Sequence, residues 1–164
     1  MIDIIVNPVA NGKKSLKFLK VAEKRLKERG AEYKVHFTEA PKHATKIAEK
    51  LSEKSDTIIA LGGDGTINEV FNGIDAEKVK FGIIPCGSGN DFIASAGIPE
   101  DPSAAVDLIL DGEAKPTDYM VCGGVRGLNI IGTGIDVDIL KRCRESKILK
   151  GKLQYVVSLI ISLI

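Results

Sequence analysis

The sequence contains few of the residues that build disulfide frameworks or metal clusters. Its 164 residues include three cysteines and two histidines, and no two cysteines are close together. An odd number of scattered cysteines argues against a disulfide framework and against a Cys-x-x-Cys metal site. His36 and His43 show no metal-ligand spacing either. The composition fits a reducing compartment, so we expect the protein to be cytoplasmic.

Long apolar runs and an excess of one charge are also absent. The first apolar run, residues 2–6, is short and contains Asp3, so it does not resemble a secretory signal. The last one, residues 155–164, is roughly half of the ~20 residues that a membrane span needs. A net charge of +1 gives no indication of nucleic-acid binding. With 44% hydrophobic and 27% charged residues, the composition is typical of a globular protein.

What is present is a regular alternation of apolar runs and amphipathic segments. Four short apolar runs predict buried strands, at residues 2–6, 33–37, 57–61 and 81–84. A helical pattern follows each strand; in the first, Leu19, Ala22 and Leu26 recur at helical spacing. Gly30 is expected to end that helix. Four strand–helix units in succession predict a Rossmann-like α/β domain, a parallel sheet with helices on both faces.

The pattern changes after Lys115 and Pro116. Residues 119–123 and 127–132 predict two short strands, and residues 124–126 predict the turn between them. We therefore expect an α/β domain over residues 1–116 and the incomplete start of a β-rich domain over residues 117–164. Because the chain ends inside an apolar run without a polar cap, we also expect it to be a fragment of a longer protein.

Three loops that are rich in glycine or small polar residues follow predicted strands. They cover residues 7–13, 62–66 and 85–90. In an open parallel sheet, ligands bind at the carboxyl ends of the strands. Glycine lets main-chain N–H groups approach an anion, and the start of a following helix adds a partial positive charge. The two glycine loops thus predict a phosphate site, and ordinary tight turns are the alternative.

Asp64 stands among these glycines, although a carboxylate repels phosphates. The conflict disappears if Asp64 holds Mg²⁺, directly or through water, or if it orients or deprotonates an acceptor hydroxyl. Thr66 and Asn68 can cap the following helix or reach a phosphate oxygen. The residues alone leave both roles of Asp64 open.

Two motifs resemble the diacylglycerol kinase catalytic domain family, which includes bacterial diacylglycerol kinases and YegS-like lipid kinases. The first is Gly62-Gly63-Asp64-Gly65-Thr66-Ile67-Asn68-Glu69-Val70, whose Gly-Gly-Asp-Gly-Thr core is shared with NAD kinases. The second is Pro85-Cys86-Gly87-Ser88-Gly89-Asn90-Asp91-Phe92, which looks like the lipid kinase branch. The segment from Leu128 to Asp136 is similar to a further family segment. The resemblance covers essentially the whole chain.

This resemblance implies a two-domain kinase that holds ATP between its domains and uses Mg²⁺ as cofactor. The implied nucleotide-binding residues are Asn7, Thr38, Gly62, Gly63, Asp64, Gly65, Thr66, Ile67, Asn68 and Ser88. The implied catalytic residues are Asp64 and Asp136, the latter by similarity to an acidic residue that faces the acceptor hydroxyl in sphingosine kinases. The family's general base and Mg²⁺ ligands are expected beyond residue 164, so this chain alone is expected to be inactive.

The implied reaction transfers the γ-phosphoryl group of ATP to a hydroxyl of diacylglycerol or another lipid, and peripheral contact with a membrane stays open. An NAD kinase-type phosphotransferase and a non-catalytic, truncated ATP-binding protein are the alternatives. If the chain is truncated, uncovered apolar residues near its end favour self-association. These residues are Leu153, Tyr155, Val156, Leu159 and Ile160.

Overall fold

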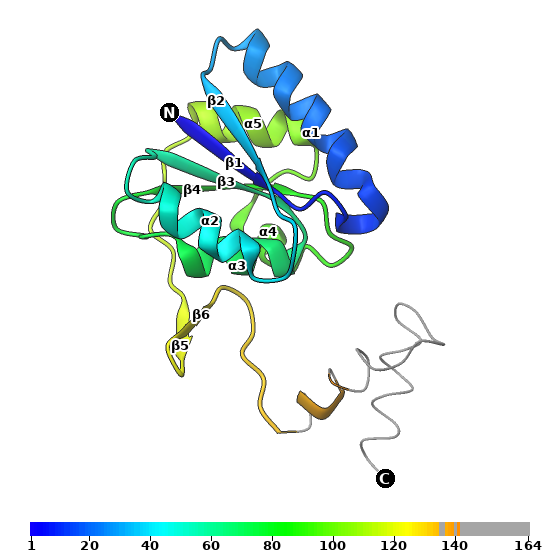
Figure 1. The fold of residues 1–164 in the computed structure, drawn as a ribbon, viewed down its shortest axis with the longest axis vertical. Coiled ribbons are helices and arrows are strands. Elements are labelled where there is room, and N and C mark those ends of the chain that lie inside the picture. The colour runs from blue at the N-terminus through cyan, green and yellow to red at the C-terminus, as the bar shows by residue number, and fades with distance from the viewer. Residues whose placement is uncertain (135–136, 140, 142–164) are drawn as a thin grey trace. The chain divides into compact units, whose positions relative to one another are not determined.

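A computed structural model describes residues 1–134, 137–139 and 141 of the chain (Figure 1). The chain divides into two compact units, Met1–Asn129 and Ile130–Ile164, and the first contains the predicted α/β sheet. In the second unit, residues 137–139 are helical. Asp136 and the apolar residues between 153 and 160 lie outside the described residues, so what was predicted for them stays a prediction.

The four predicted strands form one parallel sheet. They are β1 (Ile2–Val6), β2 (Tyr33–Phe37), β3 (Thr57–Gly62) and β4 (Lys80–Pro85), and their order is β2-β1-β3-β4. The central strands β1 and β3 contain the most deeply buried apolar residues, among them Ile4, Ile59 and Leu61, each 0% exposed. The continuous apolar runs are therefore explained by burial on both faces of the sheet.

Five helices of the first unit pack around this sheet. They are α1 (Ala10–Glu28), α2 (His43–Leu51), α3 (Asp64–Gly73), α4 (Asp91–Ala96) and α5 (Pro102–Asp111). Because side chains alternate along a strand, Ile4 and Leu61 face α1 and α5, whereas Ile5 and Ala60 face α2 and α3. The sheet thus lies between two helical layers, as Figure 1 shows. The predicted α/β architecture is confirmed.

The direction in which the chain crosses the sheet reverses between β1 and β3. The chain passes from β1 to β2 through α1 on one face, and from β3 to β4 through α3 on the other. The loops that leave β1 and β3 therefore diverge toward opposite faces. Open α/β sheets bind ligands in the crevice that forms at such a point, and both loops contain predicted ligand residues.

The first helix begins with an irregular turn. Asn11, Gly12 and Lys13 have φ angles of 47°, 62° and 71°, all in the left-handed region, so the regular helix starts after them. The predicted loop over residues 7–13 thus includes the irregular entry to α1. The helix ends at Glu28, and Gly30, with a φ of 65°, closes it as predicted.

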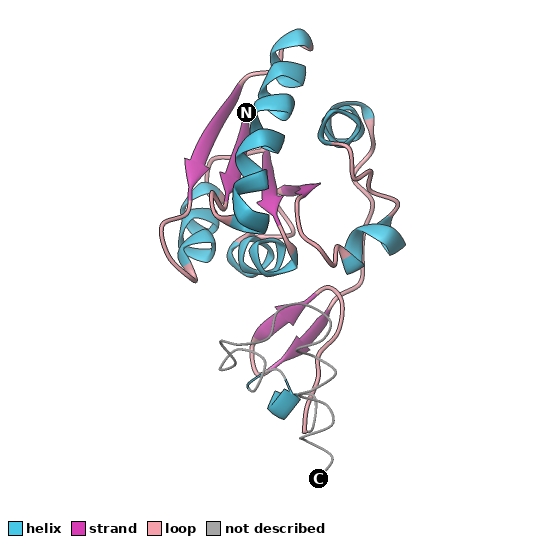
Figure 2. Cartoon of the chain, turned by 90° about the vertical axis from the view of Figure 1, so that its right-hand side faces the viewer, coloured by secondary structure: helices cyan, strands magenta, loops and turns pink. Residues whose placement is uncertain are grey.

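The predicted hairpin exists, but its turn and second strand were predicted wrongly. β5 (Met120–Cys122) pairs with β6 (Val125–Gly127) in a sheet separate from the four parallel strands (Figure 2). The turn is Gly123–Gly124, because both central positions of such a tight turn need a positive φ, here 56° and 79°. β6 stops at Gly127, opposite the first residue of β5, and does not extend to residue 132. The hairpin lies within the unit Met1–Asn129, and a domain boundary at residue 116 stays a prediction.

Candidate functional site

The loops that follow β1 and β3 meet at the carboxyl end of the sheet. The Asn7 Nδ2 group donates a hydrogen bond to Thr66 Oγ1 at 3.3 Å, and the Asn7 main-chain N–H donates to Leu61 O at 3.2 Å. The Asn7 Oδ1 atom accepts a third bond, from the Val9 N–H. Two predicted nucleotide ligands, Asn7 and Thr66, are therefore in contact although 59 positions separate them in the sequence.

The glycine loops after β3 and β4 are linked to each other. The Cys86 N–H donates to Gly62 O at 2.7 Å, and the Asn90 N–H donates to Asp64 Oδ2 at 3.1 Å. The Asn90 side chain also holds its own loop, because its Oδ1 accepts from the Gly87 N–H at 3.0 Å. The two sequence motifs thus form one continuous surface, as a shared phosphate site requires.

The glycines of the first loop have different surroundings. A Cβ atom on Gly62 would lie 2.6 Å from Thr66 Oγ1, and one on Gly63 would lie 3.2 Å from Gly87 Cα. These two positions are glycine because their neighbours pack closely. At Gly65, which is exposed, a Cβ would meet no atom within 4 Å. The missing side chain at Gly65 therefore leaves room for a ligand at the first turn of α3.

The start of α3 has main-chain donors without a partner in the helix, next to Gly65. Gly63 is the residue before the helix, in an extended conformation, and no side chain caps the helix there. Its carbonyl accepts the first helical bond, from the Ile67 N–H at 3.0 Å. The preceding N–H groups have no partner within the helix, and the helix dipole places positive charge among them. Such an end of a helix is a natural anion site.

Asp64 has one carboxylate oxygen in use and one that lacks a partner. Its Oδ2 accepts from Asn90, whereas its Oδ1 is buried and forms no hydrogen bond with the described part of the chain. Buried carboxylate oxygens normally have partners. The Asp91 carboxylate lies close, because a Cβ on Gly89 would be 3.0 Å from Asp64 Oδ2 and 3.5 Å from Asp91 Oδ2. A cation or a ligand donor would satisfy Asp64 Oδ1.

The two carboxylates at this end of the sheet are of the chemical type that would bind a magnesium ion, with a ligand supplying the remaining oxygens. Within residues 1–134, 137–139 and 141, no group of three or more His, Cys, Asp or Glu residues could hold a metal ion. Mg²⁺ is commonly bound through one or two carboxylates together with substrate phosphates. Asp64 and Asp91 would provide the carboxylates, and the positive end of α3 would favour the phosphates.

The remaining predicted ligands lie around these loops. Ser88 is exposed in the loop after β4, and Asn68 is exposed on α3. Ile67 is 2% exposed and packs in the core, so only its main chain can reach a ligand. The Thr38 N–H donates a hydrogen bond to the main-chain carbonyl oxygen of the last residue of β1 at 2.9 Å. This bond places Thr38 at the carboxyl end of β2. The position of Asp136 lies outside the described residues.

The structure adds Asn90 and Asp91, which were not among the predicted site residues. Asn90 has a φ of 55°, a left-handed conformation that asparagine tolerates better than most residues. This conformation allows it to bond both glycine loops at once. Both residues belong to the second motif, so the signal was present in the sequence. Burial raises the pKa of the thiol of Cys86 in the same motif, which disfavours the reactive thiolate form.

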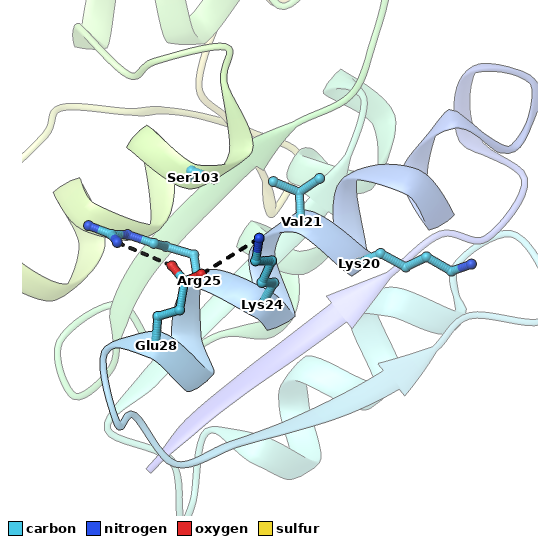
Figure 3. Close-up of a pocket in the computed structure, with 6 residues that line it drawn as sticks. All are labelled: Lys20, Val21, Lys24, Arg25, Glu28 and Ser103. Atoms are coloured by element: carbon cyan, nitrogen blue, oxygen red, sulfur yellow. Dashed lines mark hydrogen bonds and ion pairs between the residues drawn. The ribbon is translucent and has the colours of Figure 1, made fainter.

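A pocket of about 400 Å³ lies elsewhere, on the surface of α1 and the start of α5 (Figure 3). It is lined by Lys20, Val21, Lys24, Arg25, Glu28 and Ser103. Its guanidinium group is already engaged, because Arg25 Nε donates to Asp107 Oδ1 at 2.9 Å and Arg25 Nη1 donates to Glu28 Oε2 at 3.3 Å. None of the lining residues belongs to the glycine loops, so this pocket is not the predicted phosphate site.

Comparison with known proteins decides the family. The family model described as diacylglycerol kinase catalytic domain matches residues 2–122. The chain belongs to this family. It is 38% identical over 135 residues to a diacylglycerol kinase of Bacillus subtilis, and 36% identical over 128 residues to sphingosine kinase B of Dictyostelium discoideum. These alignments cover 80% and 73% of this chain, and they confirm the resemblance seen in the motifs.

A solved structure supports the same assignment. The crystal structure of a diacylglycerol kinase from Bacillus anthracis matches with a TM-score of 0.75 and 30% identity, over 97% of this chain and 53% of that chain. The alignments cover 45% of the Bacillus subtilis relative and 17% of the Dictyostelium relative. The chain therefore spans about half the length of its bacterial relatives.

Among the residues that the structure describes, no helix is both long and apolar enough to cross a membrane.

Proposed function

We propose that this chain is the nucleotide-binding part of an ATP-dependent lipid kinase. One observation carries the proposal: the two glycine loops join at the start of α3, where Asp64 Oδ1 is buried without a partner among the described residues. The names of the relatives, diacylglycerol kinase and sphingosine kinase, support a lipid hydroxyl as the acceptor. Phosphate binding at this junction is the part of the function that the chain itself supports best.

In this proposal the phosphates of ATP bind over Gly65, against the N–H groups at the start of α3. Asn7 supports the loop through its bond to Thr66, and the exposed residues Asn68 and Ser88 supply side-chain donors. Thr38 lines the adjacent strand end. Binding is then governed by fixed main-chain dipoles, which cost no reorganisation when the ligand arrives.

Asp64 and Asp91 would hold Mg²⁺ together with the phosphate oxygens. Such an ion would neutralise phosphate charge, which would favour transfer of the terminal group. The partnerless oxygen of Asp64 supports this role. If Asp64 does not hold the ion, the role proposed for its carboxylate is to orient or deprotonate the acceptor hydroxyl.

In the proposed transfer, the oxygen of the lipid hydroxyl attacks the γ-phosphorus of ATP. The new O–P bond forms as the bond to the bridging oxygen breaks, and ADP leaves with that bonding pair. The hydroxyl proton passes to a base, which the resemblance to the family puts beyond residue 164. Asp136 is the residue of this chain that is expected to face the hydroxyl. Positioning and charge stabilisation do most of the work in this class of reaction.

Isothermal titration with ATP and Mg²⁺ tests the nucleotide site. We expect saturable binding by the chain and weaker binding by Asp64→Asn, which preserves the size of the side chain and an acceptor for the Asn90 N–H. The absence of heat at millimolar nucleotide would contradict even a binding role.

A transfer assay with radioactive ATP tests the acceptor class. ATP is offered with diacylglycerol, with NAD or with no acceptor, to this chain alone and to this chain joined to the part of the Bacillus subtilis relative that the alignment does not cover. Label that appears in lipid only with the joined protein supports the proposal. Label in NAD would favour the NAD kinase-type alternative, and binding without transfer in either protein would favour a non-catalytic one.

A lipid acceptor also makes peripheral membrane contact from the cytoplasm part of the proposal. Sedimentation with vesicles of anionic phospholipid measures that contact. Self-association is a separate expectation, supported by exposed apolar side chains on the hairpin and after it, such as Val121, Val125 and Ile130. Light scattering that showed a monomer at all accessible concentrations would contradict it.

A further inference from the structure

α3 carries a second set of contacts, at the end away from the phosphate loop, that phosphate binding does not explain. Asn72 lies in its last turn and pairs with the hairpin. The Asn72 Oδ1 atom accepts from the Arg126 N–H at 2.8 Å, and its Nδ2 donates to Arg126 O at 2.8 Å. A side-chain amide here bonds both main-chain groups of a β6 residue, as a neighbouring strand would.

The same amide reaches back along the helix to a predicted nucleotide ligand. Asn72 Nδ2 also donates to Asn68 O at 2.9 Å, and it shares one of its two protons with Asn68 Oδ1 at 3.3 Å. This contact engages one of the two acceptor positions of the Asn68 side-chain carbonyl and so orients its amide. Its own NH₂ group is then the part of the side chain that can donate to an anion. Asn72 therefore connects the hairpin to one of the donors proposed for ATP.

The Arg126 side chain anchors the hairpin by a different route. Its Nη2 donates to Ile74 O at 2.7 Å, just past the end of α3, where the helix dipole favours a positive charge. Its guanidinium carbon lies 4.9 Å from the Phe71 ring centroid and 6.0 Å from that of Tyr119. The main chain and the side chain of Arg126 thus make separate contacts, which substitutions can remove one at a time.

We propose that Asn72 is a positioning residue, which transmits the docking of β6 to the Asn68 side chain and so sets the donors that Asn68 offers to the nucleotide. The inference rests on the proposed nucleotide site. It requires that Asn72 affect ATP binding through Asn68 alone. The expected loss for Asn72→Ala is about 2- to 10-fold in affinity, as for one hydrogen bond.

A double-mutant cycle on the affinity for ATP with Mg²⁺ tests this route. If Asn72 acts through Asn68, the double variant binds no more weakly than Asn68→Ala does by itself. If the double variant loses affinity by the product of the losses in the two single variants, the proposal is overturned. Asn72→Asp is the second variant if Asn72→Ala does not fold, because it keeps the acceptor for the Arg126 N–H and loses both donated protons.

Arg126→Ala is the matched control. It removes the guanidinium contacts but keeps the main-chain groups that pair with Asn72. We expect a lower melting temperature and an affinity for ATP within about twofold of the original protein. A loss of affinity as large as that of Asn72→Ala would mean that general loosening of the hairpin, and not the amide, affects the site.

The NMR signal of the Asn68 side-chain amide separates failure of this inference from failure of the proposed function. The measurement needs no nucleotide. The signal is assigned because it is absent from the spectrum of Asn68→Ala. We expect it to shift in Asn72→Ala and to stay in place in Arg126→Ala. An unshifted signal in Asn72→Ala overturns the inference, whether or not ATP binds. A shift without any ATP binding by the original protein supports the positioning role and contradicts the nucleotide site.

Discussion

The substitution Gly65→Ala separates a phosphate loop from an ordinary tight turn. The structure leaves open space at this position, and Gly65 is not among the glycines with a left-handed φ, so alanine fits without strain. Gly65 is the second residue of α3. Alanine is better than glycine in a helix by up to about 1 kcal/mol, partly because it restricts the unfolded chain. We therefore expect the free energy of unfolding to stay the same or to rise by up to ~1 kcal/mol.

The affinity for nucleotide should move in the opposite direction. A methyl group at Gly65 occupies the space into which phosphates must come to reach the N–H groups at the start of α3. We expect the dissociation constant of ATP with Mg²⁺ to rise at least tenfold, which corresponds to about 1.4 kcal/mol. Isothermal titration measures the affinity, and urea unfolding followed by circular dichroism measures the stability.

Gly62→Ala adds the same volume three positions earlier and serves as the control. Its Cβ would lie 2.6 Å from Thr66 Oγ1, and overpacking of this kind costs about 1–3 kcal/mol. This variant should lose stability, whereas Gly65→Ala should lose affinity. A stable Gly65→Ala protein that binds ATP as tightly as the original would refute the phosphate loop and leave a tight turn.

Three further predictions concern other parts of the fold. Asp3→Ala should lower the free energy of unfolding by about 2–3 kcal/mol, because a completely buried carboxylate loses two hydrogen bonds; an unchanged urea midpoint would contradict this. The hydrogen bond from Arg25 holds the pKa of Asp107 below its ordinary value of 3.8, so this carboxylate stabilises the fold above the unfolded pKa and loses that effect as the pH falls through the folded pKa. Below about pH 4, the melting temperature of Asp107→Asn should therefore fall less than that of the original protein; equal falls in the two proteins would refute the link. Gly124→Ala should speed hydrogen exchange of the Arg126 amide, because alanine is strained at a φ of 79°; unchanged protection would show that the turn tolerates it.

The strength of the burial signal explains why the parallel sheet could be predicted and the hairpin only roughly. β1 and β3 are covered on both faces, so their sequences are continuous apolar runs with clear ends. Met120–Cys122 is exposed throughout, so no alternation of apolar and polar residues marks its boundaries. The Gly123–Gly124 pair was the better signal for the turn. A tight hairpin turn of this kind needs a positive φ at both central residues, which glycine adopts readily.

Within the site, local sequence identified the loops but not the bonds between them. The motifs contain Asp64 and Asn90, yet the bond that joins them spans 26 positions and depends on how the ends of β3 and β4 align. Asn72 is a harder case, because its partner is 54 positions away and lies in the strand whose bounds were predicted wrongly. An asparagine before a glycine at a helix end reads as a turn signal, and only the folded hairpin shows what its amide binds.

The burial pattern of α3 explains why the hairpin should influence the site through side chains and not through movement of the helix. Ile67, Val70 and Phe71 are 0–5% exposed and pack against the sheet and α2, so a tilt or slide of α3 would disturb the core. Asn68 and Asn72 lie outside this core cluster, one turn apart. Because the buried face is fixed, a change at β6 can reach the phosphate loop most readily along this row of amides. The effect is then confined to Asn68, which is the condition under which a double-mutant cycle gives a clear answer.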